Sequence, residues 1–185
     1  NETAVIAISG VSGGSASEDG NQSVTITVVE EHLQPTVTLT TSATSVSEGG
    51  SDLTLTATLE VPTYEDVTVS IDGTGGASVE GTDFATVSDI TISAGNTTGT
   101  AAFNPTDDSI YDDPSETAVI AISGVSGGAA IENGTQSVTI TINDNESNPT
   151  VTLTTSANSI AENSGSSLTL TATLSRATYQ DVTVV

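Results

Sequence analysis

The chain has 185 residues, with one basic residue against 24 acidic ones and a formal net charge of −23. Nucleic acids and anionic membrane surfaces are bound through clusters of lysine and arginine, so this charge excludes both as partners. The longest apolar runs are far too short for a membrane-spanning helix, and the absence of cysteine excludes a stabilising disulfide.

Comparison of the sequence with itself reveals a tandem repeat. Four segments recur about 114 residues further along, namely 2–14 as 116–128, 22–27 as 136–141, 35–43 as 149–157 and, after one inserted residue, 53–59 as 168–174. Such periodicity is typical of repeat arrays. It predicts the C-terminal part of one repeat at 1–34, a complete repeat at 35–148 and the N-terminal part of the next at 149–185. We therefore expect an internal segment of a longer protein.

Most of the complete repeat consists of short stretches in which apolar and hydroxyl residues alternate. This pattern is typical of strands with one buried and one wet face. The predicted strands are 36–40, 53–59, 67–71, 89–93, 97–103, 117–122 and 137–142, separated by predicted turns at 48–52, 72–76, 94–96 and 132–134. The strand at 117–122 is apolar on both faces, which predicts a central position. The repeat length matches one immunoglobulin-like sandwich, so we expect an all-β fold of tandem antiparallel β-sandwiches.

Acidic residues gather in one stretch of the repeat. Asp107, Asp108, Asp112 and Asp113 lie close together, and Glu116 follows them. Two such charges 4 Å apart repel by roughly 4 kcal/mol at an effective dielectric of 20, so a hard cation among them is expected. Calcium takes six to eight oxygen ligands, whereas zinc favours histidine or cysteine. The alternative is a solvated acidic surface without a fixed ion.

A bound metal also suits the predicted core. Aromatic residues make up only 3% of the chain, so each core is expected to be thin and to need a staple. Because no disulfide is possible, calcium is the predicted stabilising cofactor.

Four motifs of the complete repeat resemble those of the Calx-β domain, which occurs in sodium–calcium exchangers and in large bacterial surface proteins. They are Val-Ser-Glu-Gly at 46–49, Gly-Thr-Asp-Phe at 81–84, the acidic stretch 107–116 and the closing strand 139–144. The resemblance covers the whole of 35–148 and implies a calcium-binding sandwich. The ligands that it implies are Glu48, Asp83, Asp107, Asp108, Asp112, Glu116 and Asp144.

The end of the last strand departs from the family pattern. The family often closes with consecutive acids, whereas this repeat has Asn143, Asp144, Asn145 and Glu146 in turn. The resemblance therefore implies fewer or weaker calcium sites here. His32 occupies the position of Glu146 in the preceding repeat, which indicates a solvent-exposed linker residue.

The residues do not indicate catalysis. Without cysteine, with a single unrepeated histidine and with no glycine-rich phosphate loop before a helix, the chain lacks the groups of ordinary enzymes. We expect instead a structural or adhesive array that forms a calcium-stiffened stalk or filament, extracellular and on a bacterial cell surface. Its expected partners are neighbouring repeats, other copies of itself, and a host or prey surface or matrix glycan.

Two alternatives remain open from the sequence. The first is a module that binds a glycan or a protein through calcium, with Tyr64, Tyr111 and Phe84 as the candidate aromatic contacts. The second is a filament subunit that assembles by strand exchange, in which neighbouring chains complete each other's sandwiches.

Overall fold

The computed structural model describes residues 2–29, 34–76, 78–111 and 115–185, with the backbone alone for 74–76. The chain forms two compact units, Asn1–Gln34 and Pro35–Val185. The regular elements of the described residues are all β-strands, and these residues include no helix that could cross a membrane. The finer division at 35–148 and 149–185 stays a prediction from the repeat.

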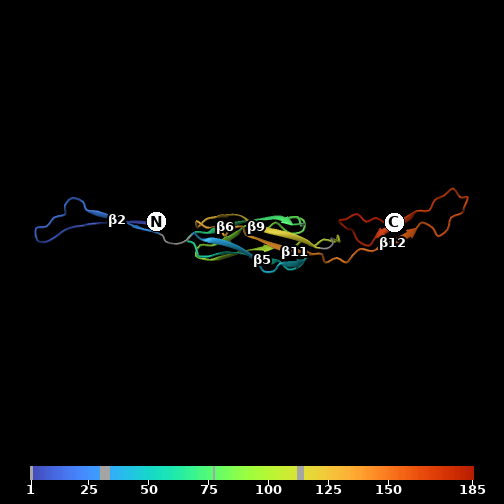
Figure 1. Cartoon of the computed structure of the whole chain (residues 1–185), viewed down its shortest axis with the longest axis horizontal. Coiled ribbons are helices and arrows are strands. Elements are labelled where there is room, and N and C mark those ends of the chain that lie inside the picture. The colour runs from blue at the N-terminus through green and yellow to red at the C-terminus, as the bar shows by residue number, and fades with distance from the viewer. Residues whose placement is uncertain (1, 30–33, 77, 112–114) are drawn as a thin grey trace. The chain divides into compact units, whose positions relative to one another are not determined.

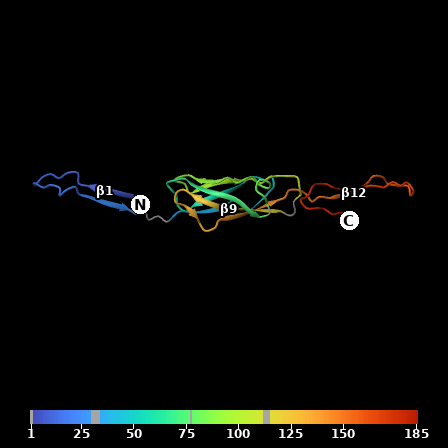
Figure 2. The same ribbon diagram turned by 90° about the horizontal axis from the view of Figure 1, so that it is seen from above.

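The second unit contains a β-sandwich. One sheet has four strands in the order β10-β3-β5-β8, and the other has five in the order β4-β11-β9-β6-β7. These strands are β3 (Thr36–Thr41), β4 (Ser45–Ser47), β5 (Leu53–Leu59), β6 (Val67–Gly76), β7 (Ile90–Ile92), β8 (Thr98–Phe103), β9 (Glu116–Ser126), β10 (Ile131–Glu132) and β11 (Ser137–Asn143). Figure 1 shows β5, β6, β9 and β11, and Figure 2 shows the unit turned by 90°. The predicted all-β sandwich fold is confirmed.

Alternating side chains of the two sheets form one hydrophobic core. In β5 the apolar residues are buried while Thr54 is exposed, because successive side chains of a strand point to opposite faces. The fully buried large side chains are Phe84, Phe103, Leu55, Leu59, Ile90, Ile92, Ile120, Ile140, Ile142, Val37, Val67 and Val69. Phe84 and Phe103 stack with ring centroids 5.0 Å apart. Phe84 is therefore a core residue, which contradicts its candidacy as a surface contact for a ligand.

Strand β9 has the central position that its sequence predicts, since it lies between β11 and β6. The predicted turn at 72–76 is wrong, because β6 continues to Gly76 with register shifts against β9. Gly73 allows β6 to pass close to the Phe84 ring in the core. A Cβ atom at this position would lie 3.1 Å from the Phe84 ring, so glycine permits close approach to the core. Glycine and aspartate in sequence can thus mark a bulged strand as well as a turn.

Two hairpins repeat the strand pairing of the sandwich. Strands β1 (Glu2–Ala7) and β2 (Ser23–Val28) pair in the register of β9 and β11, and β12 (Val151–Thr155) and β13 (Leu170–Leu174) pair in that of β3 and β5. Their side chains are nevertheless largely exposed. The recurring segments therefore form the same strand pairs in each place. Their apolar side chains are buried only where a second sheet packs against them.

Candidate metal centre

A parallel strand pair brings two acidic residues together at one end of the sandwich. Strands β4 and β11 pair with Ser47 opposite Asn143, and Glu48 and Asp144 are the next residues along each strand. The backbone N–H of Glu48 donates to the Asn143 carbonyl oxygen at 3.0 Å, which extends this pairing by one step. The positions of Glu48 and Asp144 therefore follow from the register of two strands that are distant in sequence.

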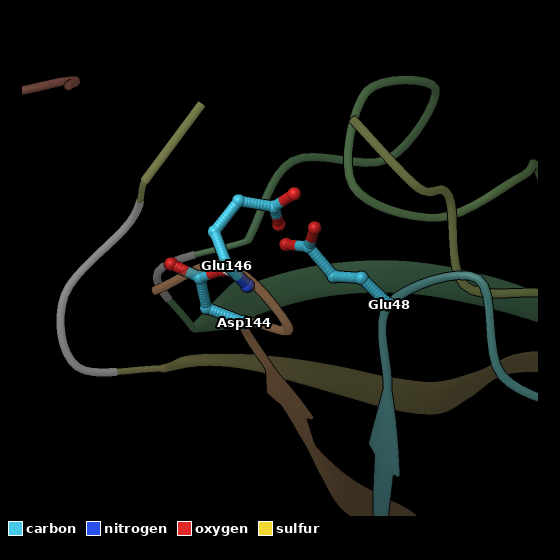
Figure 3. Close-up of side chains that lie close together, drawn as sticks. All are labelled: Glu48, Asp144 and Glu146. Atoms are coloured by element: carbon cyan, nitrogen blue, oxygen red, sulfur yellow. Dashed lines mark hydrogen bonds between the residues drawn. The ribbon is translucent and has the colours of Figure 1, made fainter. Parts of the chain in front are cut away.

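Glu146 completes a cluster of three carboxylates. One oxygen atom from each of Glu48, Asp144 and Glu146 lies within 4.8 Å of the other two. Figure 3 shows that the Glu48 and Glu146 side chains point toward one another from separate segments, with Asp144 beside them. We call these three residues the carboxylate cluster. The Glu146 backbone N–H donates to Asp144 Oδ1 at 2.7 Å, which holds the segment after β11 in place.

The loop that contains Asp107 and Asp108 is attached to this cluster. Asn145 Nδ2 donates to Asp107 Oδ1 at 2.7 Å and to the Glu48 carbonyl oxygen at 3.2 Å. Gly49 has a φ of 55°, and a Cβ atom there would lie 2.9 Å from the Cβ atom of Asp107. Glycine thus permits both the left-handed turn after Glu48 and the close approach of the acidic loop.

The cluster carries an electrostatic cost in the metal-free protein. Burial, followed by the charges of Asp108, Asp144 and Glu146, raises the pKa of Glu48 to about 7, although a backbone hydrogen bond with Asp108 opposes the shift. Burial also raises the pKa of Glu146 above its ordinary value. A hydrogen bond with Asp144 adds to that rise, and the charge of Arg176 opposes it. A bound cation would replace the repulsion among these carboxylates, which adds to the effect of burial, by attraction.

Two oxygen atoms of the cluster are buried without a hydrogen-bond partner, namely Glu48 Oε2 and Glu146 Oε2. The Glu146 side chain is only 10% exposed. Buried polar atoms in proteins almost always have a partner, so these two oxygens need an explanation. A hard divalent cation would satisfy both, because calcium binds carboxylate oxygens. Glu48, Asp144 and Glu146 therefore fit a calcium ion, and the ion would supply positive charge among them.

The structure brings some of the predicted ligands together. Glu48 and Asp144 belong to the carboxylate cluster, and Asp107 and Asp108 lie near enough for their charges to act on Glu146 and Glu48 respectively. Asp108 Oδ1 also accepts a hydrogen bond from the backbone N–H of Ile110 at 2.7 Å, as in a turn.

The other predicted ligands are not members of the carboxylate cluster or lie outside the described residues. Asp83 Oδ2 accepts a hydrogen bond from the backbone N–H of Val79, so this carboxylate closes its own turn. Glu116 begins β9 opposite Ile142. Asp112 lies outside the described residues. The assignment of all these residues as calcium ligands stays a prediction.

Glu146 was not among the ligands predicted from the sequence. Its counterpart His32 suggested a linker position, and His32 itself lies outside the described residues. The available signal was the spacing of Asp144 and Glu146, since residues two apart in an extended chain point to the same side. The resemblance already placed Asp144 with Glu48, but the proximity of Glu146 was not predicted, because the strand pattern does not indicate the β4–β11 pairing.

The pKa of Glu48 predicts a pH dependence of the metal-free protein. A carboxyl group whose pKa rises from 4.5 to about 7 on folding binds its proton more tightly in the folded state. Stability therefore falls as pH rises from about 4.5 to 7 and stays low above that range. After a discount for solvent screening, we expect a loss of about 1–2 kcal/mol.

Urea unfolding of the wild type and of Glu48→Gln in calcium-free buffer between pH 4.5 and 8 would measure this effect. The difference between the two proteins isolates Glu48, because every other titrating group is common to both. A difference that stays constant with pH would contradict the predicted protonation of Glu48.

Comparisons with known proteins support the fold. A scan against protein-family models finds no match, and a search of curated proteins finds no relative. Among solved structures, the apo form of the Calx CBD1 domain matches with a TM-score of 0.50 and 16% identity, over 60% of this chain and 99% of that one.

Two further structures match less well. CBD12 from CALX1.2 has a TM-score of 0.49 and 16% identity, over 58% of this chain and 44% of that one. A two-domain protein of unknown function from Bacteroides fragilis NCTC 9343 has a TM-score of 0.45 and 12% identity, over 68% of this chain and 56% of that one. The likeness to the CBD1 domain establishes a Calx-β-like sandwich fold and extends no further than the fold.

Proposed function

We propose that this chain is part of a calcium-stiffened array of β-sandwich repeats, which gives length and rigidity to a structural or adhesive stalk outside a bacterial cell. The observation that carries the proposal is the carboxylate cluster with its two buried, unpartnered oxygen atoms. An enzymatic role is not part of the proposal, because the sequence lacks the usual catalytic groups.

The position of the cluster supports a role in stiffness. Asp144 and Glu146 follow β11 directly, and β12 begins at Val151 only a few residues later. A calcium ion held by Glu48, Asp144 and Glu146 would therefore fix the start of the connection between two repeats to the preceding sandwich. At millimolar calcium and a Kd on the order of 10⁻⁴ M, binding adds about 1–3 kcal/mol of stability per site.

Spin labels would test whether calcium restricts the connection between repeats. The chain has no cysteine, so Thr98→Cys on β8 and Thr171→Cys on β13 would introduce two unique labelling sites, both exposed. We expect calcium to narrow the distribution of distances between the labels, measured by pulsed electron paramagnetic resonance on the whole chain.

A labelled chain that also carries Glu48→Gln and Glu146→Gln is the matched control, in which calcium is expected to leave the distribution unchanged. Magnesium serves as a second control, since it is smaller and demands a stricter octahedral geometry. A wild-type distribution that is equally broad with and without calcium would contradict the stiffening role even if calcium binds.

A further inference from the structure

The turn that follows β13 contacts the acidic end of the sandwich at three points. The Tyr111 backbone N–H donates to the Ala177 carbonyl oxygen at 3.0 Å. The Tyr179 hydroxyl donates to Asp108 Oδ2 at 3.4 Å. Arg176 Nη1 lies 3.5 Å from Glu146 Oε1. Residues 175–180, which we call the docking turn, thus contact the preceding repeat through a backbone bond, a hydroxyl and a charge.

The charged contact is partly shielded from solvent. The Glu146 side chain is 10% exposed and that of Arg176 is 32% exposed. Arg176 is the single basic residue among the 185, and it lies beside a cluster of carboxylates. Opposite charges attract more strongly where water is partly excluded, so this pair is expected to contribute more than a fully exposed one.

The docking turn has a shape that recurs in the complete repeat. Thr178 Oγ1 donates to the Gln180 carbonyl oxygen at 2.6 Å, and Thr63 Oγ1 donates to the Glu65 carbonyl oxygen at 2.7 Å. Tyr179 likewise corresponds to a tyrosine, at position 64. The two turns therefore share this local hydrogen bond and a tyrosine at the same position.

The charged pair, in contrast, differs between the two connections in this chain. At the equivalent positions, Glu146 is replaced by His32 and Arg176 by Val61. Both members of the pair are absent together, and valine cannot form an ion pair. The sequence therefore differs between the repeats at both positions of this pair.

From these contacts we propose that the docking turn recognises the acidic end of the preceding repeat, and that the residues at positions 146 and 176 determine which connections of the array are locked by charge. The Glu146–Arg176 pair supplies this charged contact, and valine at position 61, which is equivalent to 176, could not supply it. This inference goes beyond calcium binding, because all three contacts form between groups of the protein itself.

Amide hydrogen exchange would test the role of the charged pair directly, because the Tyr111 N–H donates to the Ala177 carbonyl oxygen of the docking turn. In calcium-free buffer, nuclear magnetic resonance would follow this amide in the wild type, Arg176→Val, Glu146→Gln and the double variant. Each single substitution is expected to accelerate exchange about two- to fivefold, and the double variant is expected to exchange no faster than the single ones. Arg176→Lys, which keeps the charge, is expected to retain part of the protection.

The Ser175 amide supplies an internal control, because its bond to the Thr150 carbonyl oxygen at 2.9 Å lies within the following repeat. Its exchange is expected to stay unchanged in all variants, which would show that this repeat keeps its fold. Equal Tyr111 exchange in the wild type and Arg176→Val would overturn the proposal, as would additive effects in the double variant. Because no calcium is present, neither result depends on calcium binding.

Discussion

Replacement of Ile120 by alanine is expected to lower the free energy of unfolding by about 2–5 kcal/mol. Ile120 is 0% exposed and belongs to β9, between β11 and β6 in the five-stranded sheet. The substitution removes buried methyl and methylene groups and leaves a cavity, and a core with so few aromatic rings has little else to fill it. Urea unfolding followed by circular dichroism would measure the loss.

The chain contains a matched control for this substitution. Ile6 occupies the same place in the identical segment 2–14, yet it is 56% exposed in β1. Ile6→Ala is expected to change the stability of the sandwich by no more than about 0.5 kcal/mol. Equal losses from the two substitutions would contradict the assignment of the core to the two sheets of the second unit.

The second large effect is expected from Glu48→Gln, and its sign depends on calcium. At pH 8 in calcium-free buffer, the substitution removes a charge that burial and neighbouring carboxylates disfavour. We therefore expect the variant to be more stable than the wild type by about 1–2 kcal/mol, after a discount for solvent screening. With millimolar calcium the wild type is expected to gain about 1–3 kcal/mol, and the variant little or nothing.

Thermal and urea unfolding with and without calcium would reveal this reversal. Glu65→Gln is the matched control, since it removes the same charge from an exposed position outside the carboxylate cluster and should respond to calcium like the wild type. If Glu48→Gln destabilised the calcium-free protein, the predicted cost of the Glu48 charge, from burial and neighbouring carboxylates, would be contradicted.

Much of the fold could be predicted because most strands carry a period-two pattern. Residues 53–59 were predicted as a strand and form β5 with the same bounds. Strands β4 and β10 were not predicted, since three and two residues are too few to show a period and both pair parallel with distant partners. The turn predicted at 72–76 was wrong for another reason. Glycine at position 73 permits close packing against Phe84 and does not mark a turn.

The candidate site was less predictable than the fold. The resemblance to the Calx-β domain indicated Glu48 and Asp144, and the structure places both in the carboxylate cluster. Glu146 and Arg176 were not singled out, because their roles depend on contacts between segments that sequence periodicity does not relate. Buried oxygen atoms without partners are likewise a property of three-dimensional packing, and no pattern in the sequence indicates them.

Calorimetric titration of calcium into the whole chain would show whether the carboxylate cluster binds calcium. We expect saturable binding with a Kd on the order of 10⁻⁴ M, which Glu48→Gln combined with Glu146→Gln removes and Glu65→Gln leaves intact. A wild-type titration without saturable heat, or one that the double substitution leaves unchanged, would contradict calcium binding at the carboxylate cluster.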